Sequence, residues 1–407
     1  MRDLAKTVKE YSLDPVNEKH RKIWTAVNDR KMIIPAVMAR DYPAYLINWN
    51  DEMTTTIEAP FFREIELMLL EKIYEWKHMR CNRVIEDIVY CPVAVTDTRF
   101  GIQISAPEKM MDHQVIDKAV HFDRIIDNEA DLEKIARPEI SYDEKETMER
   151  KTRMEEVFGD ILRVKLQGID HFHFAPWDDL LSWMNIEEGM YGFVENPDFM
   201  HKAVSRYVEM SIYRARRYEE MGILSSNNRN VNIAAGGYGY TTELPPPTES
   251  GIGARLKDNW GDGRDQIFTS ISPAMSAEFG FAYEKQWADL FGMSYYGCCE
   301  NLDHKVEEAK QLPRLRKISM SPYARAEEMM ERVGSDMVIS FKANSNYLAF
   351  SPWQKDLLKA ELIKVCGLAR KYGCSMEILM KTLIHLDGDP TRLWEWCDMA
   401  TDIAANY

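Results

Sequence analysis

The feature that most constrains the fold of this chain is a regular alternation of short apolar runs and helical segments in its second half. The later runs start about twenty residues apart, which is the length of a strand, a turn, a helix and a second turn. Strands that alternate with helices form a parallel sheet, because parallel neighbours need crossover connections. About seven or eight such units fit between residues 85 and 407. The sequence therefore predicts an α/β fold, and it favours a (β/α)8 TIM barrel over an open sheet.

The expected elements follow from apolar periodicity and from the Gly and Pro residues at their ends. Strands are expected at residues 89–95, 161–166, 230–235, 317–320, 337–341 and 376–384, with another ending near Tyr296. Helices are expected at residues 17–30, 61–79, 147–158, 197–221, 273–291, 303–311, 324–333 and 391–405. We interpret residues 1–84 as a helical extension packed on the barrel domain, 85–407. This extension covers a barrel end or an oligomer contact, so a homodimer is one option.

Charge and cysteine content narrow the classes of partner. The net charge of -15 argues against a nucleic-acid partner, since such proteins bind the phosphate backbone through basic patches. No apolar run approaches the roughly 20 residues that span a bilayer, and the charged N-terminus lacks a signal-type apolar core. We therefore expect a cytoplasmic protein without a membrane partner. The seven cysteines are irregularly spaced, so reduced thiols are expected rather than a disulfide framework.

The densest group of potential metal ligands lies between residues 294 and 304. Cys298, Cys299, Glu300, Asp303 and His304 fall there, after a predicted strand and before a predicted helix. In a regular strand the side chains of Cys298 and Cys299 would face opposite sides, although a bulge would allow both to face one site. Thiolate, imidazole and carboxylate donors suit zinc. The alternative is that adjacent cysteines are small buried hydrophobic residues.

Three further regions offer candidate site residues. The loop 236–245 is rich in glycine, which permits close approach of backbone to a ligand, and it carries Tyr238, Tyr240 and Glu243. His171 and His173 would share one strand face and line a pocket together, with Trp177 close by in the sequence. Polar residues also follow two predicted strands, namely Lys342, Asn344 and His385. Each group also has a purely structural interpretation, such as a turn, a core histidine or a strand end.

A set of motifs in the second half resembles a known family. The motifs are Ser272-Pro273 before a helix, the segment from Tyr296 to Glu300, the segment from Pro313 to Pro322, and the segment from Ser340 to Asn344. Together they are similar to the uroporphyrinogen decarboxylase superfamily. They resemble more narrowly its corrinoid-dependent methyltransferases, including the substrate-side component of aromatic ether O-demethylases. The resemblance covers residues 85–405 and implies a (β/α)8 barrel.

The resemblance also implies an activity and a set of site residues. The expected reaction moves a methyl group from a methoxylated aromatic to Co(I) of cobalamin on a separate corrinoid protein, with zinc as Lewis acid. This chain departs from the family by having Tyr296 where a His precedes the Cys, and Lys381 and His385 where another Cys is expected. Relatives use varied ligand sets that include carboxylates, so the candidate zinc ligands are Glu243, Cys298, Cys299 and Glu300.

The remaining roles follow from the same expected reaction. The expected acids are His171, His173 and His385, and the expected substrate contacts are Trp177, Tyr238, Tyr240, Trp260, Lys342 and Asn344. No basic pocket for a porphyrinogen is present in the sequence, which argues against decarboxylation. Two alternatives stay open: methyl transfer from another donor, such as methanol, a methylamine or a methylthiol, and a non-catalytic corrinoid-binding barrel.

Overall fold

The central element of the protein is a parallel sheet. A computed structural model describes residues 1–102 and 124–407. Six strands pair in parallel in the order β1-β10-β9-β8-β7-β6. These strands are β1 (Ala36–Ala39), β6 (Trp260–Gly263), β7 (Met293–Tyr296), β8 (Leu315–Met320), β9 (Val338–Lys342) and β10 (Ser375–Met380). The predicted α/β class with a parallel sheet is therefore confirmed.

Two smaller strand pairs stand beside this sheet. β2 (Ile88–Pro92) pairs in parallel with β5 (Arg163–Gln167), and β3 (Ala94–Asp97) pairs antiparallel with β4 (Ile140–Asp143). On one side, the backbone N of Asn82, ahead of β2, donates to the carbonyl of Val37 in β1. On the other side, the backbone after β5 pairs with residues 223–225. The arrangement is consistent with a TIM-barrel-like fold, with six paired strands in one sheet in place of a continuous ring of eight.

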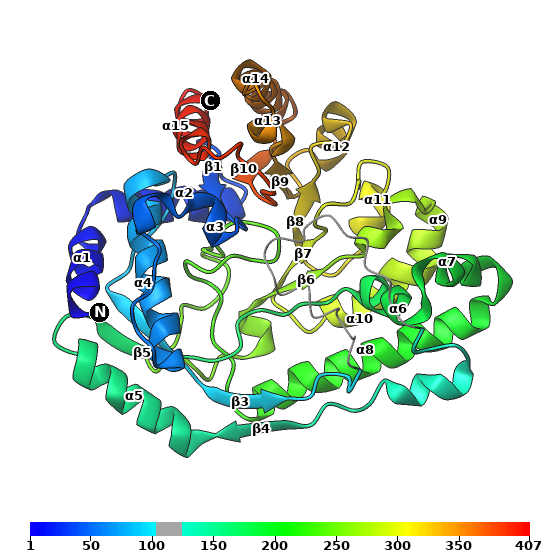
Figure 1. The fold of residues 1–407 in the computed structure, drawn as a ribbon. Helices are drawn as coiled ribbons and strands as arrows, with labels where there is room; N and C mark the ends of the chain where they lie inside the picture. Colours follow the sequence, from blue (N-terminus) through cyan, green and yellow to red (C-terminus); the bar gives the residue numbers. More distant parts are fainter. Residues whose placement is uncertain (103–123) are drawn as a thin grey trace.

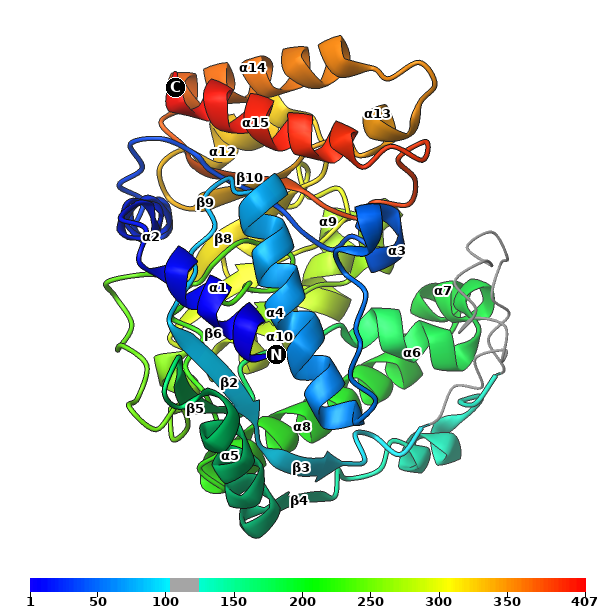
Figure 2. The same ribbon diagram turned by 60° about the vertical axis from the view of Figure 1, so that its left-hand side comes forward.

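Helices surround the strands on the outside, as Figures 1 and 2 show. This covering explains why both faces of the central strands are buried; every residue of β8 after Leu315, and all of β9 and β10, is inaccessible. The longer helices are α1 (Arg2–Ser12), α2 (Val16–Asn28), α4 (Pro60–His78), α5 (Glu144–Phe158), α8 (Pro197–Glu220), α14 (Lys355–Tyr372) and α15 (Thr391–Ala405). The shorter ones are α3 (Ala44–Ile47), α6 (Pro176–Met184), α7 (Ile186–Glu195), α9 (Pro273–Met275), α10 (Ala282–Ala288), α11 (Val306–Ala309), α12 (Ala326–Val333) and α13 (Asn346–Ala349). Across the described ranges, no helix has the length and apolar character that crossing a membrane requires.

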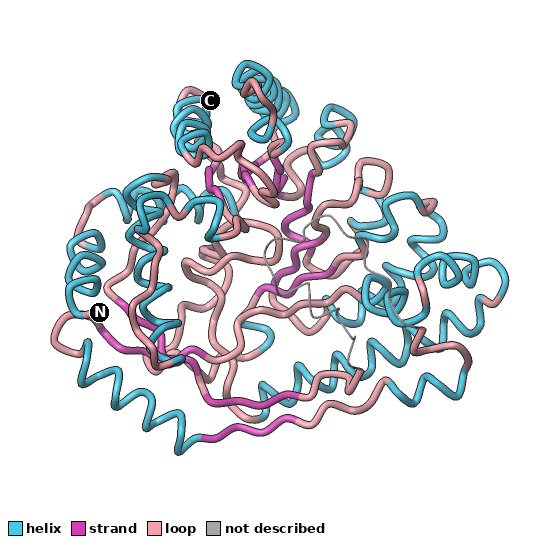
Figure 3. Tube along the Cα trace, in the orientation of Figure 1, coloured by secondary structure: helices cyan, strands magenta, loops and turns pink. Residues whose placement is uncertain are grey.

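Most expected helices are present, but three expectations differ from the structure. The expected strand at 230–235 is a loop with an isolated bridge between Asn232 and Tyr238, one of the long loops inside the ring of helices in Figure 3. The expected helix 303–311 is only the single turn α11. The extension 1–84 contains β1, which pairs with β10 in the central sheet. Short strands are specified by their neighbours more than by propensity, which explains β1 and the missing strand.

Candidate functional site

The polar groups of the candidate site gather at the carboxyl ends of the parallel strands. β7 ends at Tyr296, and Gly297 turns the chain with φ of 94°. A side chain at Gly297 would be strained in this conformation, and its Cβ would approach Leu302 Cδ1 to 2.5 Å. The turn ends the regular strand alternation, so the expectation that Cys298 and Cys299 face opposite sides does not hold.

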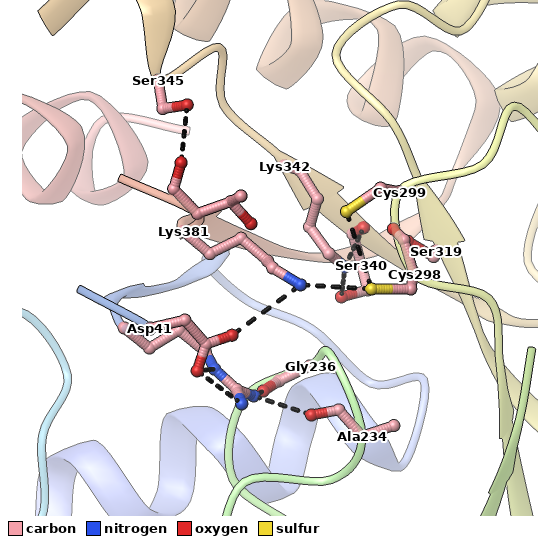
Figure 4. A network of polar contacts seen from close by, with 12 residues as sticks. Asp41, Ala234, Gly236, Cys298, Cys299, Ser319, Ser340, Lys342, Ser345 and Lys381 are labelled. Carbon is pink, nitrogen blue, oxygen red and sulfur yellow. Dashed lines mark hydrogen bonds and ion pairs between the residues drawn. The ribbon is translucent and has the colours of Figure 1, made fainter. Parts of the chain in front are cut away.

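Both cysteines instead contact one another, and Cys298 also contacts a lysine. The two Sγ atoms are 3.6 Å apart, and Lys381 Nζ, just after β10, lies 3.4 Å from Cys298 Sγ (Figure 4). On its other side Lys381 Nζ is 3.7 Å from Asp41 Oδ2. The hydrogen bond from the Cys299 thiol, together with the charges of Lys381 and Arg264, lowers the pKa of Cys298 to about 5. Donating that bond raises the pKa of Cys299. The contacts with Cys299 and Lys381 therefore favour the thiolate form of Cys298.

A cavity of about 220 Å³ opens beside this group. Its lining comes from the ends of β1, β5, β6 and β10 and from the loop 232–235, and much of it is charged. The charged and titratable lining residues include Arg40, Asp41, His171, Asp262, Arg264 and Lys381. The guanidinium of Arg40 donates to the carbonyls of Ala234 and Gly236, which holds the loop at the cavity wall (Figure 4). The cavity has room for a small polar ligand.

One wall of the cavity carries a histidine–carboxylate pair. His171 Nδ1 lies 2.6 Å from Asp170 Oδ1, and the other oxygen of Asp170 accepts from Arg229 at 2.6 Å. The hydrogen bond to Asp170 raises the pKa of His171. Burial would raise the pKa of Asp170, but His171 and Arg229 lower it below its usual range. The pair can therefore hold and release a proton at His171.

The lining also carries Asp262 and Arg264, which flank the end of β6. Burial raises the pKa of Asp262 to about 7, although Arg264 acts in the other direction. Arg264 donates to His173 Nδ1, so that nitrogen carries no proton. Burial, with Arg264 as the second cause, lowers the pKa of His173 to about 4. Asp262 can thus act as a proton donor near neutral pH, whereas His173 is neutral.

Behind Cys298 lie three buried carboxyl groups, with the buried Lys305 near enough to interact with all three charges. Asp265, Glu284 and Glu300 are each at most 3% exposed, and each has at least one oxygen without a hydrogen-bond partner. Burial raises the pKa of Glu284 to about 8 and that of Glu300 to about 7. The other oxygen of Glu300 accepts from the backbone N of Cys298 at 2.7 Å. Glu300 therefore holds the turn after β7, and none of the three groups lines the cavity.

The described residues do not form the expected zinc site. Glu243 pairs with Arg316 at the start of β8, whereas the carbonyl of Cys298 accepts from Ser319 near the end of that strand. Glu243 therefore lies about 10 Å back toward the amino end of the strand, at the opposite end of the sheet. Nowhere within residues 1–102 and 124–407 do three Cys, His, Asp or Glu side chains converge as metal ligands. The third group at the cysteines is the lysine amine, which is not among the usual zinc ligands.

The predicted substrate contacts are mostly not brought together. Trp260 lines the cavity. Trp177 is fully buried and donates to the carbonyl of Phe279, and Tyr238 packs against Trp24 of α2. Tyr240 lies beside Glu86, and Asn344 lies at the start of α13. Lys342 does not line the cavity, but it lies beside Tyr295 and Ser340, close enough to Cys298 for its charge to lower the pKa of that thiol.

Among the predicted acids, His171 and His173 line the cavity. His385 is exposed on the loop after β10, where Nδ1 accepts from the backbone N of Asp387. Sequence reasoning missed Asp262 and Arg264 because β6 reads Trp-Gly-Asp-Gly, a run of low strand propensity. The feature of the sequence that could have revealed this part of the site is the pair of charged residues, Asp262 and Arg264, shortly after Trp260.

Comparison with known proteins finds likeness among solved structures but not among family models or curated proteins. No family model matches the sequence, and no curated protein matches it. A solved structure of a methyltransferase from Methanosarcina mazei is similar with a TM-score of 0.47 and 11% sequence identity, over 94% of this chain and 98% of that chain.

Proposed function

We propose that the protein is a methyltransferase that takes a methyl group from a small donor bound in the 220 Å³ cavity. The proposed donor is a methoxylated aromatic compound, and the proposed acceptor is Co(I) of a separate corrinoid protein. Two observations support this proposal: the motifs of the second half, and the position of the cavity at the carboxyl ends of the strands, where such barrels carry their chemistry. Zinc is left out of the proposal because the described donors do not fit it.

The observation that carries the proposal is a proton donor in the cavity wall. A methyl ether releases its methyl group poorly because the oxygen would leave as an alkoxide or phenoxide. Protonating that oxygen as the bond breaks removes the difficulty. Asp262 has a pKa of about 7 and lines the cavity, so its carboxylic acid can supply that proton, and His171 is a second donor. Arg264 and Trp260 would position the donor against Asp262.

A second candidate is a methylated amine. Asp41, Asp170 and Asp262 all line the cavity, and three carboxylates would stabilise a methylammonium group. The corrinoid acceptor would be the same. A barrel that binds a corrinoid protein without catalysis would need no proton donor in the cavity, so the charged lining favours the two enzymatic candidates.

The test is a spectroscopic assay with a Co(I) corrinoid protein and a panel of methoxylated aromatics, methylamines and methanol. We expect methoxylated aromatics to consume the Co(I) absorption, and Asp262→Asn to slow this by about 100-fold. Because Asp262 donates only when protonated, the wild-type rate should fall as pH rises through about 7. Glu71→Gln, in α4, is the matched control, since the pKa of Glu71 is also raised to about 7 away from the cavity.

Each outcome decides between the candidates. Consumption of Co(I) by a methylamine alone would replace the aromatic donor with an amine and keep the methyltransferase. If no donor consumes Co(I) while the corrinoid protein still binds, the non-catalytic interpretation holds and the proposal is wrong.

A further inference from the structure

Three side-chain atoms meet beside the cavity in an arrangement that resembles part of a metal site; of the three residues, Lys381 lines the cavity, and the two cysteines lie next to it. Two thiolates on one tetrahedral zinc lie about 3.8 Å apart, given zinc–sulfur bonds of about 2.3 Å. The Sγ atoms of Cys298 and Cys299 are 3.6 Å apart, close to this value. Where a tetrahedral zinc site would have a third ligand, this protein has Lys381 Nζ, 3.4 Å from Cys298 Sγ. A positive charge already stands where a metal would supply one.

We propose that Cys298, paired with Lys381, is a metal-free thiolate nucleophile that takes the methyl group from the donor before it passes to the acceptor. The donor's identity rests on the proposed function. The thiolate itself rests on the contacts around Cys298, which come from three different strand ends.

The backbone and side chain of Cys298 are held on every polar atom. Its N donates to Glu300. Its carbonyl accepts from Ser319, and its sulfur contacts Cys299 and Lys381 (Figure 4). This degree of fixation is what a nucleophile needs for in-line attack. A cysteine that only fills space in a core needs none of these contacts.

The backbone beside Lys381 supports a functional interpretation. Asp41, the second partner of Lys381, has φ of 53°, and Thr382, its neighbour in the chain, has φ of 57°. Both are left-handed conformations that cost energy for residues with a side chain, and such residues cluster at functional sites. The structure thus maintains two unfavourable conformations on either side of this lysine.

The other cysteines differ from Cys298. A hydrogen bond with Cys397 and the charge of Arg83 also lower the pKa of Cys81, but its sulfur contacts the carbonyl of Cys397 in the packed core. Cys91, Cys366 and Cys374 are buried, and burial raises the pKa of each to about 11. Cys299 is exposed, but its proton is engaged with Cys298. Cys298 is therefore the cysteine expected to react first.

The chemical step balances without an added redox partner. The Cys298 thiolate attacks the methyl carbon, a sulfur–carbon bond forms and the carbon–oxygen bond breaks. The electron pair goes to the leaving oxygen, which takes the proton of Asp262. The products are S-methylcysteine at Cys298, a demethylated alcohol or phenol, and an Asp262 carboxylate. Transfer of the methyl group to the acceptor regenerates the thiolate.

The first test uses iodomethane, a probe small enough for a side chain in a residue that is only 6% exposed. We expect mass spectrometry to find the first methyl group on Cys298. Lys381→Met should slow this labelling by about tenfold, and Lys381→Arg, which keeps the charge, should largely restore it. Cys299→Ser is the matched control, because its hydroxyl can still donate to Cys298. First labelling of Cys299, or an unchanged rate in Lys381→Met, would overturn the proposal.

The second test measures metal by elemental analysis of the purified protein. We expect substoichiometric zinc in the wild type, and zinc uptake by Lys381→Cys, which completes a set of three thiol donors. Near-stoichiometric zinc in the wild type that is lost in Cys298→Ser would show that the site is a metal centre and would overturn the proposal.

The third test separates this proposal from the proposed function. Incubation with a donor that consumes Co(I), but without the corrinoid protein, should leave one methyl group on Cys298. If Cys298→Ser still consumes Co(I) at the wild-type rate, the nucleophile is wrong and the methyltransferase stands. If no donor consumes Co(I), the proposed function is wrong, and the iodomethane rates alone decide whether Cys298 is the nucleophile.

Discussion

Two buried lysines of this protein have anionic partners, and the two pairs differ in what surrounds them. Lys317 Nζ in β8 lies 2.6 Å from Glu377 Oε2 in β10, and both side chains are completely buried. Lys381 Nζ lies 3.4 Å from Cys298 Sγ and also lines the cavity. One pair is sealed inside the sheet, whereas the other borders space in which a ligand can bind.

The sealed pair is fully satisfied. Besides Lys317, Glu377 accepts from Ser340 and from the backbone N of Gly237, so both oxygens have partners. Burial alone would raise the pKa of Glu377, but Lys317 and Lys342 lower it below its usual range. A buried charge with this many partners fixes the strands and the loop around it. The open pair has a longer contact and fewer partners, which leaves the sulfur able to react.

The largest expected effect comes from breaking the sealed pair. Lys317→Met leaves Glu377 buried without its closest cation, and we expect a loss of about 3–5 kcal/mol in the free energy of unfolding. Denaturant titration followed by circular dichroism measures this loss. The double variant Lys317→Met/Glu377→Gln should recover part of it, because the uncompensated charge is then removed. Equal losses in the single and double variants would show that the pair is not coupled.

The second effect tests a buried carboxyl group, Glu284, whose two oxygens have no hydrogen-bond partner. The folded pKa of Glu284 is about 8, above the ordinary value of 4.5. Between about pH 5 and 8 the unfolded chain has therefore lost a proton that the folded chain keeps. Folding is then favoured less as pH rises, by up to about 1.4 kcal/mol per pH unit. Asp262, Glu300 and Glu71 contribute slopes of the same sign up to about pH 7, so Glu284→Gln should reduce the slope in unfolding titrations made at several pH values, most clearly between about pH 7 and 8.

The control for this slope is a carboxylate whose pKa is lowered, whereas that of Glu284 is raised. Glu327, on α12, is hydrogen-bonded to Lys371, and that bond lowers its pKa. Glu327 loses its proton below the range from about pH 5 to 8 in both the folded and the unfolded chain. Glu327→Gln should therefore leave the slope in that range unchanged. If Glu284→Gln shows the same slope as the wild type, Glu284 is not the group responsible.

The smallest expected effect on stability comes from the open pair. Lys381→Met should cost about 1–2 kcal/mol, because Cys298 can take up a proton and become a neutral thiol. The same denaturant titration measures it. A loss as large as that of Lys317→Met would show that the open pair is as structural as the sealed one, and would remove the contrast between them.

Much of the fold could be predicted from the sequence because it depends on local patterns. The apolar runs of β8, β9 and β10 and the Pro and Gly at the ends of α8 are visible along the chain, and those elements are confirmed. The strand β6 was missed for the same reason, since two of its four residues are glycine. A short strand with such a sequence is fixed by the hydrogen bonds of its neighbours.

The candidate site also has residues that the sequence could place and residues that only the tertiary structure could place. The sequence by itself placed Cys298 and His171 at strand ends, and the structure finds both beside the cavity region. Only the tertiary structure placed Lys381, 83 residues away, against Cys298, and Glu243 at the opposite end of the sheet beside Arg316. The physical reason is that strand order and register, which are set by long-range pairing, decide which side chains meet. Local sequence specifies where a strand ends, whereas packing of the whole sheet specifies what stands next to that end.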